Sequence, residues 1–322
     1  MNSAMNTIPS IFNERRIPYT ILGKSGADPL SANISAIVLN RGARYYLASV
    51  FQNLISAGVS SIVFVESSRS GFELENLSTQ FPDVKFLIPA ADISIGEMIN
   101  LGMSEIFSDY VLVIWNDMSL QSSVFSERLI EQLSRDDCVA AAPLLFDAKN
   151  NSLPVQIVPS LADTEFSTEQ FLCRRDSVKT IYMYDFAAIY NREKFIRLGG
   201  FDYTITNPYW QNLDFGFRTY LWGYVTMISN TFKMRYAGTS PTEDISADNS
   251  YIRFYLKNLA PDIGKSGAYL PLRIFFSYAK KSGLNPLHAY KQFKAAKDWV
   301  HMHKHYFHMT PRKLISEWEP II

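Results

Sequence analysis

Short runs of apolar, mostly β-branched residues alternate with amphipathic segments between residues 34 and 117 of this 322-residue chain. Runs of this length, bounded by polar and turn residues, are typical of strands buried on both faces. We predict such strands at residues 34–39, 61–65, 84–88 and 111–115. Apolar residues at helical spacing predict the helices between them, at residues 45–57, 72–77 and 94–107. This alternation favours an α/β fold with a mixed, mostly parallel sheet flanked by helices.

Beyond residue 117 the alternation is less regular. Helices are predicted at residues 124–133, 192–198 and 212–221, and strands at residues 139–143, 181–190 and 225–228. Residues 144–178 carry few periodic signals, and we interpret them as an excursion over the ligand side of the sheet. From residue 246 the chain becomes helical and more basic, with helices predicted at residues 246–259, 272–282 and 286–307.

These patterns divide the chain into three parts. Residues 1–30 are polar and aperiodic, are broken by Pro9, Pro18 and Pro29, and are predicted to form an N-terminal arm. Residues 31–243 are predicted to form the main α/β domain, and residues 244–322 a helical C-terminal region.

The overall composition excludes some classes of function. Lys+Arg and Asp+Glu both number 31, so there is no basic excess that would favour nucleic acid as a partner. Cys138 and Cys173 give neither a disulfide framework nor a CxxC metal site, which favours a reducing, cytoplasmic location. No stretch approaches the roughly 18 apolar residues of a membrane span.

Polar residues follow four of the predicted strands, at Asn40, Glu66, Asp92 and Asp117. In open α/β sheets, ligands bind just beyond the carboxyl ends of the strands. These four positions therefore predict a ligand-binding edge. For Asp117 alone, an alternative is that it caps the helix that follows. A GxGxxG motif after the first strand and a P-loop are both absent from the sequence, so neither a standard dinucleotide fold nor a P-loop enzyme is supported.

The C-terminal segment contains all five histidines. On a helix, His301, His305 and His308 share one face and could bind a metal, but their neighbours are Lys and Tyr, and a plain polar face is the alternative. The lysines between residues 291 and 304 are interleaved with aromatic residues. This pattern fits an amphipathic helix that meets anionic lipid, or equally a helix packed on the main domain.

Six pieces of sequence occur in a characteristic order, at residues 34–41, 63–68, 94–102, 110–117, 187–202 and 210–218. The most specific is residues 187–202, an apolar strand followed by Asn-Arg-Glu-Lys-Phe and then by Gly-Gly-Phe-Asp. In this order the pieces resemble family 2 glycosyltransferases, and the resemblance spans residues 34–238. It implies the GT-A fold, with the helical C-terminal region as an appendage.

The resemblance also implies a donor site for a nucleotide-diphosphate sugar. Asn40 and Glu66 would contact the nucleoside, and Asn100 lies in the helix that ends in Asn-x-Gly. Asp117 falls on the family's DxD motif and would bind the diphosphate or its metal ion, Mn²⁺ or Mg²⁺. Such an ion neutralises the charge that develops on the leaving diphosphate.

On the acceptor side, the resemblance points to three residues. Asp214 would be the base that takes the proton of the acceptor hydroxyl, or would only pair with Arg218 one turn later. Asp185 and Trp210 would bind the acceptor, although Trp210 could instead pack in the core.

The sequence departs from the family at its chemical residues. The DxD motif stands as Trp115-Asn116-Asp117, the usual acidic pair of the later helix stands as Gln211-Asn212, and the metal-binding His near residues 236–238 is missing. A carboxamide cannot act as a base. Two functions therefore stay open: transfer of a sugar to a hydroxyl of a glycan or other acceptor, or a catalytically degenerate relative that serves as a nucleotide-binding or assembly subunit. A nucleotidyltransferase is a further alternative, for which residues 40–44 offer only a faint basic loop.

Overall fold

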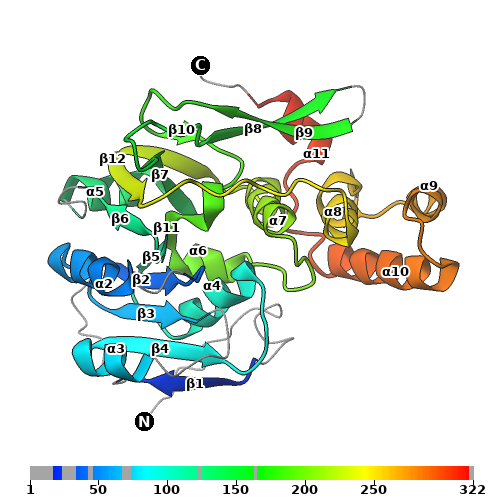
Figure 1. The fold of residues 1–322 in the computed structure, drawn as a ribbon. Helices are drawn as coiled ribbons and strands as arrows, with labels where there is room; N and C mark the ends of the chain where they lie inside the picture. Colours follow the sequence, from blue (N-terminus) through cyan, green and yellow to red (C-terminus); the bar gives the residue numbers. More distant parts are fainter. Residues whose placement is uncertain are drawn as a thin grey trace, which may run out of the picture.

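The computed structural model describes residues 17–23, 34–42, 46–66, 74–121, 125, 127–162 and 165–318. Its centre is a ten-stranded mixed sheet (Figure 1). The strands follow the order β1 (Tyr19–Leu22), β4 (Val84–Pro89), β3 (Ile62–Val65), β2 (Ile34–Leu39), β5 (Tyr110–Trp115), β11 (Ala188–Asn191), β7 (Ala140–Phe146), β12 (Thr226–Tyr236) and β10 (Val178–Lys179), and β6 (Met118–Leu120) pairs with β12.

The predicted fold class is confirmed. Strands β4, β3, β2 and β5 are parallel neighbours, and β7 and β12 form a second parallel pair. β11 lies antiparallel between β5 and β7. Because β2, β3, β5, β7 and β12 therefore all run in one direction, their carboxyl ends meet at the same edge of the sheet. Helices flank the sheet: α2 (Leu47–Ser56), α3 (Leu74–Gln80), α4 (Ile95–Ser104), α5 (Glu127–Asp136), α6 (Arg192–Arg197) and α7 (Pro208–Leu221).

Local sequence explains where two helices that support the site begin. The side chain of Ser94 accepts a hydrogen bond from the Glu97 backbone, and the Glu97 side chain accepts one from the Ser94 backbone, which together form a capping box for α4. Asn207 caps α7, with Pro208 at its first position. α7 is buried on all sides after Pro208. At Gly216 a Cβ atom would lie 1.8 Å from the carbonyl oxygen of Ile181. Only glycine permits this close passage.

Several predicted elements differ from the structure in their bounds. The predicted strand at residues 181–190 is a strand only in β11, because a 3₁₀ turn, Tyr184–Phe186, interrupts its first half. The predicted strand at residues 225–228 continues as β12 to Tyr236. β1 adds an antiparallel edge strand within the predicted N-terminal arm, most of which lies outside the described residues.

Residues 144–178 contain a regular element that the periodicity did not reveal. β8 (Gln156–Ala162) and β9 (Glu165–Phe171) form a separate two-stranded sheet, which lies above α7 in Figure 1. Phe166 on β9 packs edge-on against Phe217 of α7, with 5.3 Å between ring centroids. The pair is therefore anchored by α7.

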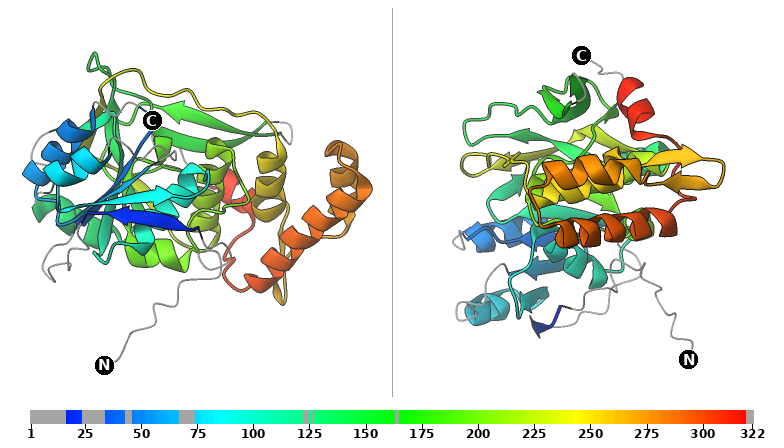
Figure 2. Two further views of the ribbon diagram at one scale, coloured as in Figure 1. Left: turned by 60° about the horizontal axis from the view of Figure 1, so that its bottom comes forward. Right: turned by 90° about the vertical axis from the view of Figure 1, so that its right-hand side faces the viewer.

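The C-terminal region consists mainly of helices, as predicted. It contains α8 (Asn249–Phe254), the π-helical turn η3 (Tyr255–Leu259), the small hairpin β13 (Asp262–Gly264) and β14 (Gly267–Tyr269), and then α9 (Arg273–Lys281), α10 (Pro286–Met302) and α11 (Pro311–Ser316). α10 ends at Met302, five residues before the predicted end. α9 and α10 project from the body as a helical hairpin (Figure 2), and a small core around Phe293 joins them to Leu256 of η3. Among the described residues, no helix combines the length and the apolar character needed to cross a membrane.

Candidate functional site

A buried network of side-chain amides joins the carboxyl ends of β2, β3 and β5. Asn40 donates a hydrogen bond to Glu66 (Nδ2 to Oε1, 2.7 Å), and Asn116 donates one to Asn40 (Nδ2 to Oδ1, 2.9 Å). The backbone N–H groups of Arg41 and Gly42 donate to Asn116 and Asn40 in turn. The predicted positions Asn40 and Glu66 therefore lie in this network, and the predicted Asp117 follows its third member, Asn116. Asp92 is exposed and lies outside the network. Asn40 and Glu66 are buried, so their role is to fix the loop that carries Arg41.

Arg41 extends from this loop to two carboxylates. Its Nη2 donates a hydrogen bond to Asp185, and its Nε lies 3.4 Å from Oδ1 of Asp117. The guanidinium carbon stands 3.9 Å from the ring centroid of Trp115, within the range of a cation–π interaction. Tyr236 donates a second hydrogen bond to Asp185 (2.8 Å). We call Arg41, Trp115, Asp117, Asp185 and Tyr236 the arginine cluster.

The two carboxylates of the arginine cluster are electrostatically perturbed. Burial raises the pKa of Asp185 to about 6, although Arg41 and Tyr236 act in the opposite direction. Burial also raises the pKa of Asp117, again opposed by Arg41. Carboxylates with raised pKa values concentrate at functional sites, because catalysis and ligand binding use groups that titrate near neutral pH.

The backbone at Asp185 is strained as well. Asp185 and Phe186 both have positive φ, 54° and 62°, in the left-handed region that non-glycine residues avoid. Each such residue costs about 1–3 kcal/mol and persists only where its surroundings impose it. The indole N–H of Trp115 donates to the Asp185 carbonyl (2.9 Å), which helps to hold this turn. Such strain is concentrated at functional sites, in agreement with the perturbed carboxyl group.

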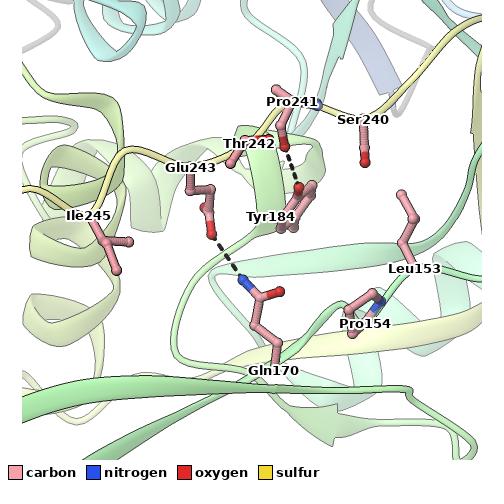
Figure 3. Close-up of a pocket in the computed structure, with 9 residues that line it drawn as sticks. All are labelled: Leu153, Pro154, Gln170, Tyr184, Ser240, Pro241, Thr242, Glu243 and Ile245. Atoms are coloured by element: carbon pink, nitrogen blue, oxygen red, sulfur yellow. Dashed lines mark hydrogen bonds between the residues drawn. The ribbon is translucent and has the colours of Figure 1, made fainter.

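A pocket of about 380 Å³ opens beside the arginine cluster (Figure 3). Tyr184, the neighbour of Asp185, lies in its centre, and its hydroxyl donates to the carbonyl of Pro241 (2.6 Å). The segment of residues 237–248, which connects β12 to α8, forms one side of the pocket and carries Glu243. Leu153, Pro154 and Gln170, from the predicted excursion, form the opposite side.

Glu243 is a functional candidate that the sequence analysis did not identify. Its Oε2 accepts hydrogen bonds from Tyr182 (2.7 Å) and Gln170 (3.0 Å). Burial raises its pKa to about 7; the hydrogen bond from Tyr182 opposes this rise, and the nearby charge of Asp185 adds to it. A carboxylate that titrates near pH 7 at the wall of a pocket is suited to accept a proton. No local pattern marks Glu243, because its burial depends on β9 and on Tyr182.

Asp214 lies far from solvent in an ion-pair network. Its side chain is 0% exposed, and its carboxylate contacts Arg218 (3.0 Å), Lys257 (2.7 Å) and Asn258 (2.7 Å). Lys257 also contacts Asp202 at 2.7 Å. The network joins α7 to the C-terminal region through η3. Of the two roles left open for Asp214, these surroundings favour the structural pair with Arg218, and they give an acceptor hydroxyl no access to the carboxylate.

Asn100 and Trp210 also have structural partners. The side chain of Asn100 makes two hydrogen bonds with the backbone of Phe201 (2.8 and 3.0 Å) and so fixes the Gly-Gly-Phe-Asp segment against α4. Trp210 is 5% exposed, packs against Tyr251 and Phe254, and donates to the carbonyl of Ser246 (2.8 Å). The core-packing alternative for Trp210 is therefore the one that the geometry favours.

The carboxamides at positions 211 and 212 serve as structural links. Gln211 accepts from the backbone N–H of Gly96 (2.8 Å) and donates to Ser94 (2.9 Å), which joins α7 to the start of α4. Asn212 donates to the carbonyl of Met183 (2.6 Å), just before the strained turn. The donated bonds require N–H groups that a carboxylate does not have. The two carboxamides therefore tie α7 to the segments beside it.

The surroundings of Asp117 do not fit the expected Mn²⁺ or Mg²⁺ ion. Asp117 and Asp185 already face the same guanidinium, and the position before Asp117 is an amide whose two polar atoms are both used within the protein. Within the described part of the chain there is also no group of three or more His, Cys, Asp or Glu side chains placed to hold a metal. His301, His305 and His308 do not share a helical face as predicted, because α10 ends at Met302 and His305 and His308 lie beyond it.

A second pocket, of about 480 Å³, lies between the main domain and α10. Arg253, Lys291 and Trp299 are among its lining residues. It lies apart from the arginine cluster and from the ligand edge of the sheet. The pocket beside Tyr184 and Glu243 is therefore the better candidate for an acceptor.

Comparison with known proteins supports the fold. No protein-family model matches the sequence, and no curated protein matches it either. Among solved structures, the chain is similar to GalNAc-T7 in complex with UDP, GalNAc and Mn²⁺, with a TM-score of 0.52 at 11% identity over 86% of this chain. It spans 59% of that protein's chain.

A second solved structure gives the same result. Residues 1–349 of TarS from S. aureus, in complex with UDP-GlcNAc, match with a TM-score of 0.52 at 10% identity, over 84% of this chain and 72% of that one. Both are structures of GT-A glycosyltransferases. At these identities the likeness establishes the fold, and the GT-A architecture expected from the sequence is confirmed.

Proposed function

We propose that this protein is a GT-A glycosyltransferase, of the family 2 type, that transfers a sugar from a nucleotide-diphosphate sugar to a hydroxyl group of a glycan or other acceptor. The observation that carries the proposal is the juxtaposition of the arginine cluster with the Glu243 pocket. The first lies at the carboxyl ends of β2 and β5, where α/β sheets bind ligands. The second adds a carboxyl group that titrates near pH 7.

In this proposal the donor lies over the ends of β2, β3 and β5. Asn40 and Glu66 fix the loop beneath the nucleotide, Arg41 and Asp117 face the diphosphate, and Asn100 supports the neighbouring Gly-Gly-Phe-Asp segment. An inverting transfer needs a carboxylate that takes the proton of the acceptor hydroxyl. Glu243 fills this role better than Asp214, because Glu243 lines a pocket and Asp214 is sealed in the core. Asp185, next to Tyr184, connects the two halves of the site.

The rival is a catalytically degenerate relative that kept the nucleotide edge. The residues Trp115, Gln211 and Asn212 favour it, because each stands where the family has a carboxylate, and both amides are used in packing. The two readings make different predictions for turnover: only the enzyme releases a nucleoside diphosphate from its donor when an acceptor hydroxyl is present.

Calorimetric titration with UDP, GDP and dTDP tests the donor site. We expect one of the three to bind, and we expect its monophosphate to bind about 10-fold or more weakly, because the second phosphate supplies the charge that Arg41 meets. Donor turnover is then followed as release of the bound nucleotide from its sugar conjugates in the presence of glycan acceptors. Binding with no turnover would favour the degenerate relative, and no binding of any nucleotide would contradict the donor site.

We further propose a cytoplasmic protein that contacts anionic membranes through α9 and α10. Both cysteines are free and buried, in keeping with a reducing compartment. The hairpin exposes large apolar side chains, with Phe276 77%, Leu272 63% and Leu287 60% exposed. The same two helices carry exposed basic side chains: Arg273, Lys280, Lys291, Lys294 and Lys297. Apolar tips surrounded by basic charge are complementary to the headgroup region of an anionic bilayer.

Phe276→Asp is expected to weaken binding to vesicles of phosphatidylglycerol and phosphatidylcholine by about 10-fold or more, because insertion of a phenyl ring contributes about 1.5–3 kcal/mol. Co-sedimentation measures the effect. Phe107→Asp is the matched control, since Phe107 is also exposed (64%) but lies on the main domain, before β5. Equal binding by wild type and Phe276→Asp, or equal binding to vesicles of phosphatidylcholine alone, would contradict the membrane contact.

A further inference from the structure

The position that a divalent cation takes in the family is filled here by a side chain. Asp117 is the carboxylate that remains of the DxD motif, and the guanidinium of Arg41 lies between it and Asp185. An ion bound to both carboxylates would have to displace this guanidinium. The ring of Trp115 beneath it and the backbone bond from Arg41 to Asn116 (3.2 Å) both hold Arg41 in place.

Asn116, the middle residue of the motif, belongs to the same arrangement. The side chain of Asn116 donates to Asn40 through Nδ2 and accepts from the Arg41 backbone through Oδ1. An ionised Asp at this position could accept the second bond but could not make the first. Asn116 therefore fixes the loop that delivers Arg41, and Trp115, at the position of the lost carboxylate, packs against its guanidinium.

The guanidinium also retains a donor group for a ligand. Nη2 donates to Asp185, Nε lies 3.4 Å from Asp117 Oδ1 without a hydrogen bond, and no residue in the described parts of the chain hydrogen-bonds to Nη1. The Arg41 side chain is 22% exposed, so solvent reaches it. Asp185 also accepts a hydrogen bond from the hydroxyl of Tyr236, so Arg41 is not its only partner. A planar guanidinium that is oriented on two sides and open on the third is suited to bind phosphate oxygens.

We propose that Arg41 replaces the divalent cation at the donor diphosphate, so that this protein binds its nucleotide without a metal ion. The inference rests on the proposed function, because it assigns the ligand of the same donor site. It also predicts that the carboxylates of Asp117 and Asp185 become available to a metal once Arg41 is removed.

The test combines two titrations on the full-length chain. In the first, the nucleoside diphosphate that binds wild type is titrated in EDTA and again with Mn²⁺, and we expect the two affinities to agree within about twofold. Arg41→Ala is expected to lower the affinity in EDTA by about 10- to 100-fold, because a charge-assisted contact is lost. Arg41→Lys keeps the charge but lacks the planar guanidinium, so its affinity should lie between those of wild type and Arg41→Ala. Arg235→Ala, which removes a neighbouring arginine that contacts Asn150 instead, should bind as wild type.

In the second titration, Mn²⁺ is added without nucleotide. Wild type is expected to show no binding, and Arg41→Ala is expected to bind one ion. Nucleotide binding by wild type that requires Mn²⁺, undiminished binding by Arg41→Ala, or failure of Arg41→Ala to bind Mn²⁺ would each overturn the inference. If wild type binds no nucleotide, the donor-site proposal fails by itself, and the Mn²⁺ titrations still decide whether Arg41 fills a cation position. Should Arg41→Ala not fold, Arg41→Lys and the EDTA comparison on wild type decide.

Discussion

Replacing Lys257 by methionine is expected to lower the free energy of unfolding by about 3–5 kcal/mol, because it leaves buried carboxylates without their cation. The ammonium group of Lys257 lies 2.7 Å from both Asp202 and Asp214, and its side chain is 0% exposed. Methionine has a similar volume, so loss of charge dominates over loss of packing. Urea unfolding followed by circular dichroism measures the change.

The dependence of the free energy of unfolding on pH, measured at low pH, gives a second test of the same variant. Burial alone would raise the pKa of Asp202, but the charges of Lys257 and Arg253 lower it well below its ordinary value. A carboxyl group with a depressed folded-state pKa stabilises the protein above its unfolded pKa, about 4, and this contribution is lost as the pH falls below that value. The stability gap between wild type and Lys257→Met should therefore be widest above pH 4 and narrow below it.

Lys297→Met is the control for this prediction, since Lys297 is exposed on α10 and its loss should change the stability by less than about 0.5 kcal/mol. A loss of less than about 1 kcal/mol in Lys257→Met would show that Arg218 and Arg253 compensate the two carboxylates without it. In that case the network would not be what holds the C-terminal region against α7.

The parts of the fold that could be predicted from sequence are those whose signal lies within one short stretch of residues. β3 and most of β5 are continuous apolar runs buried on both faces, and such runs have few other stable arrangements. The Asp214–Arg218 pair could be anticipated for the same reason, because residues four apart on a helix face one another. The polar strand ends also predicted that Asn40, Glu66 and Asp117 lie at the same edge of the sheet, while ligand binding at this edge stays a prediction.

What the sequence could not show depends on distant partners. Asp214 contacts both Arg218 and Lys257, and Lys257 belongs to η3, far along the chain. Nothing in the sequence near Asp214 therefore revealed this second cation. β8 includes Pro159 and β9 has mixed polar residues, so neither has the alternation that identifies a strand. Because β9 supplies Gln170 to the pocket, missing this strand also concealed Glu243. Asp117 follows β5, but its partner Arg41 belongs to another strand end.

Glu243→Gln is expected to reduce the rate of sugar transfer by about 10²–10⁴-fold, because a carboxamide cannot take the proton of the acceptor hydroxyl. Gln has nearly the same shape as Glu, and its carbonyl oxygen can still accept from Tyr182 and Gln170. The affinity for the donor nucleotide should stay within about twofold of wild type, since Glu243 lies on the acceptor side. The measurement compares kcat and nucleotide affinity in the same preparations.

The pH profile separates a base from a structural carboxyl group. Burial raises the pKa of Glu243 to about 7, and a base works only in its ionised form. The wild-type rate should therefore rise with pH through about 7 and then level off, and the residual rate of Glu243→Gln should lack this rise. Asp244→Asn, at the next and fully exposed position, should keep both the rate and the profile of wild type. A Glu243→Gln variant with the wild-type rate would remove Glu243 from the chemistry and leave Asp185, with its pKa of about 6, as the carboxyl group of the site that titrates nearest to neutral pH.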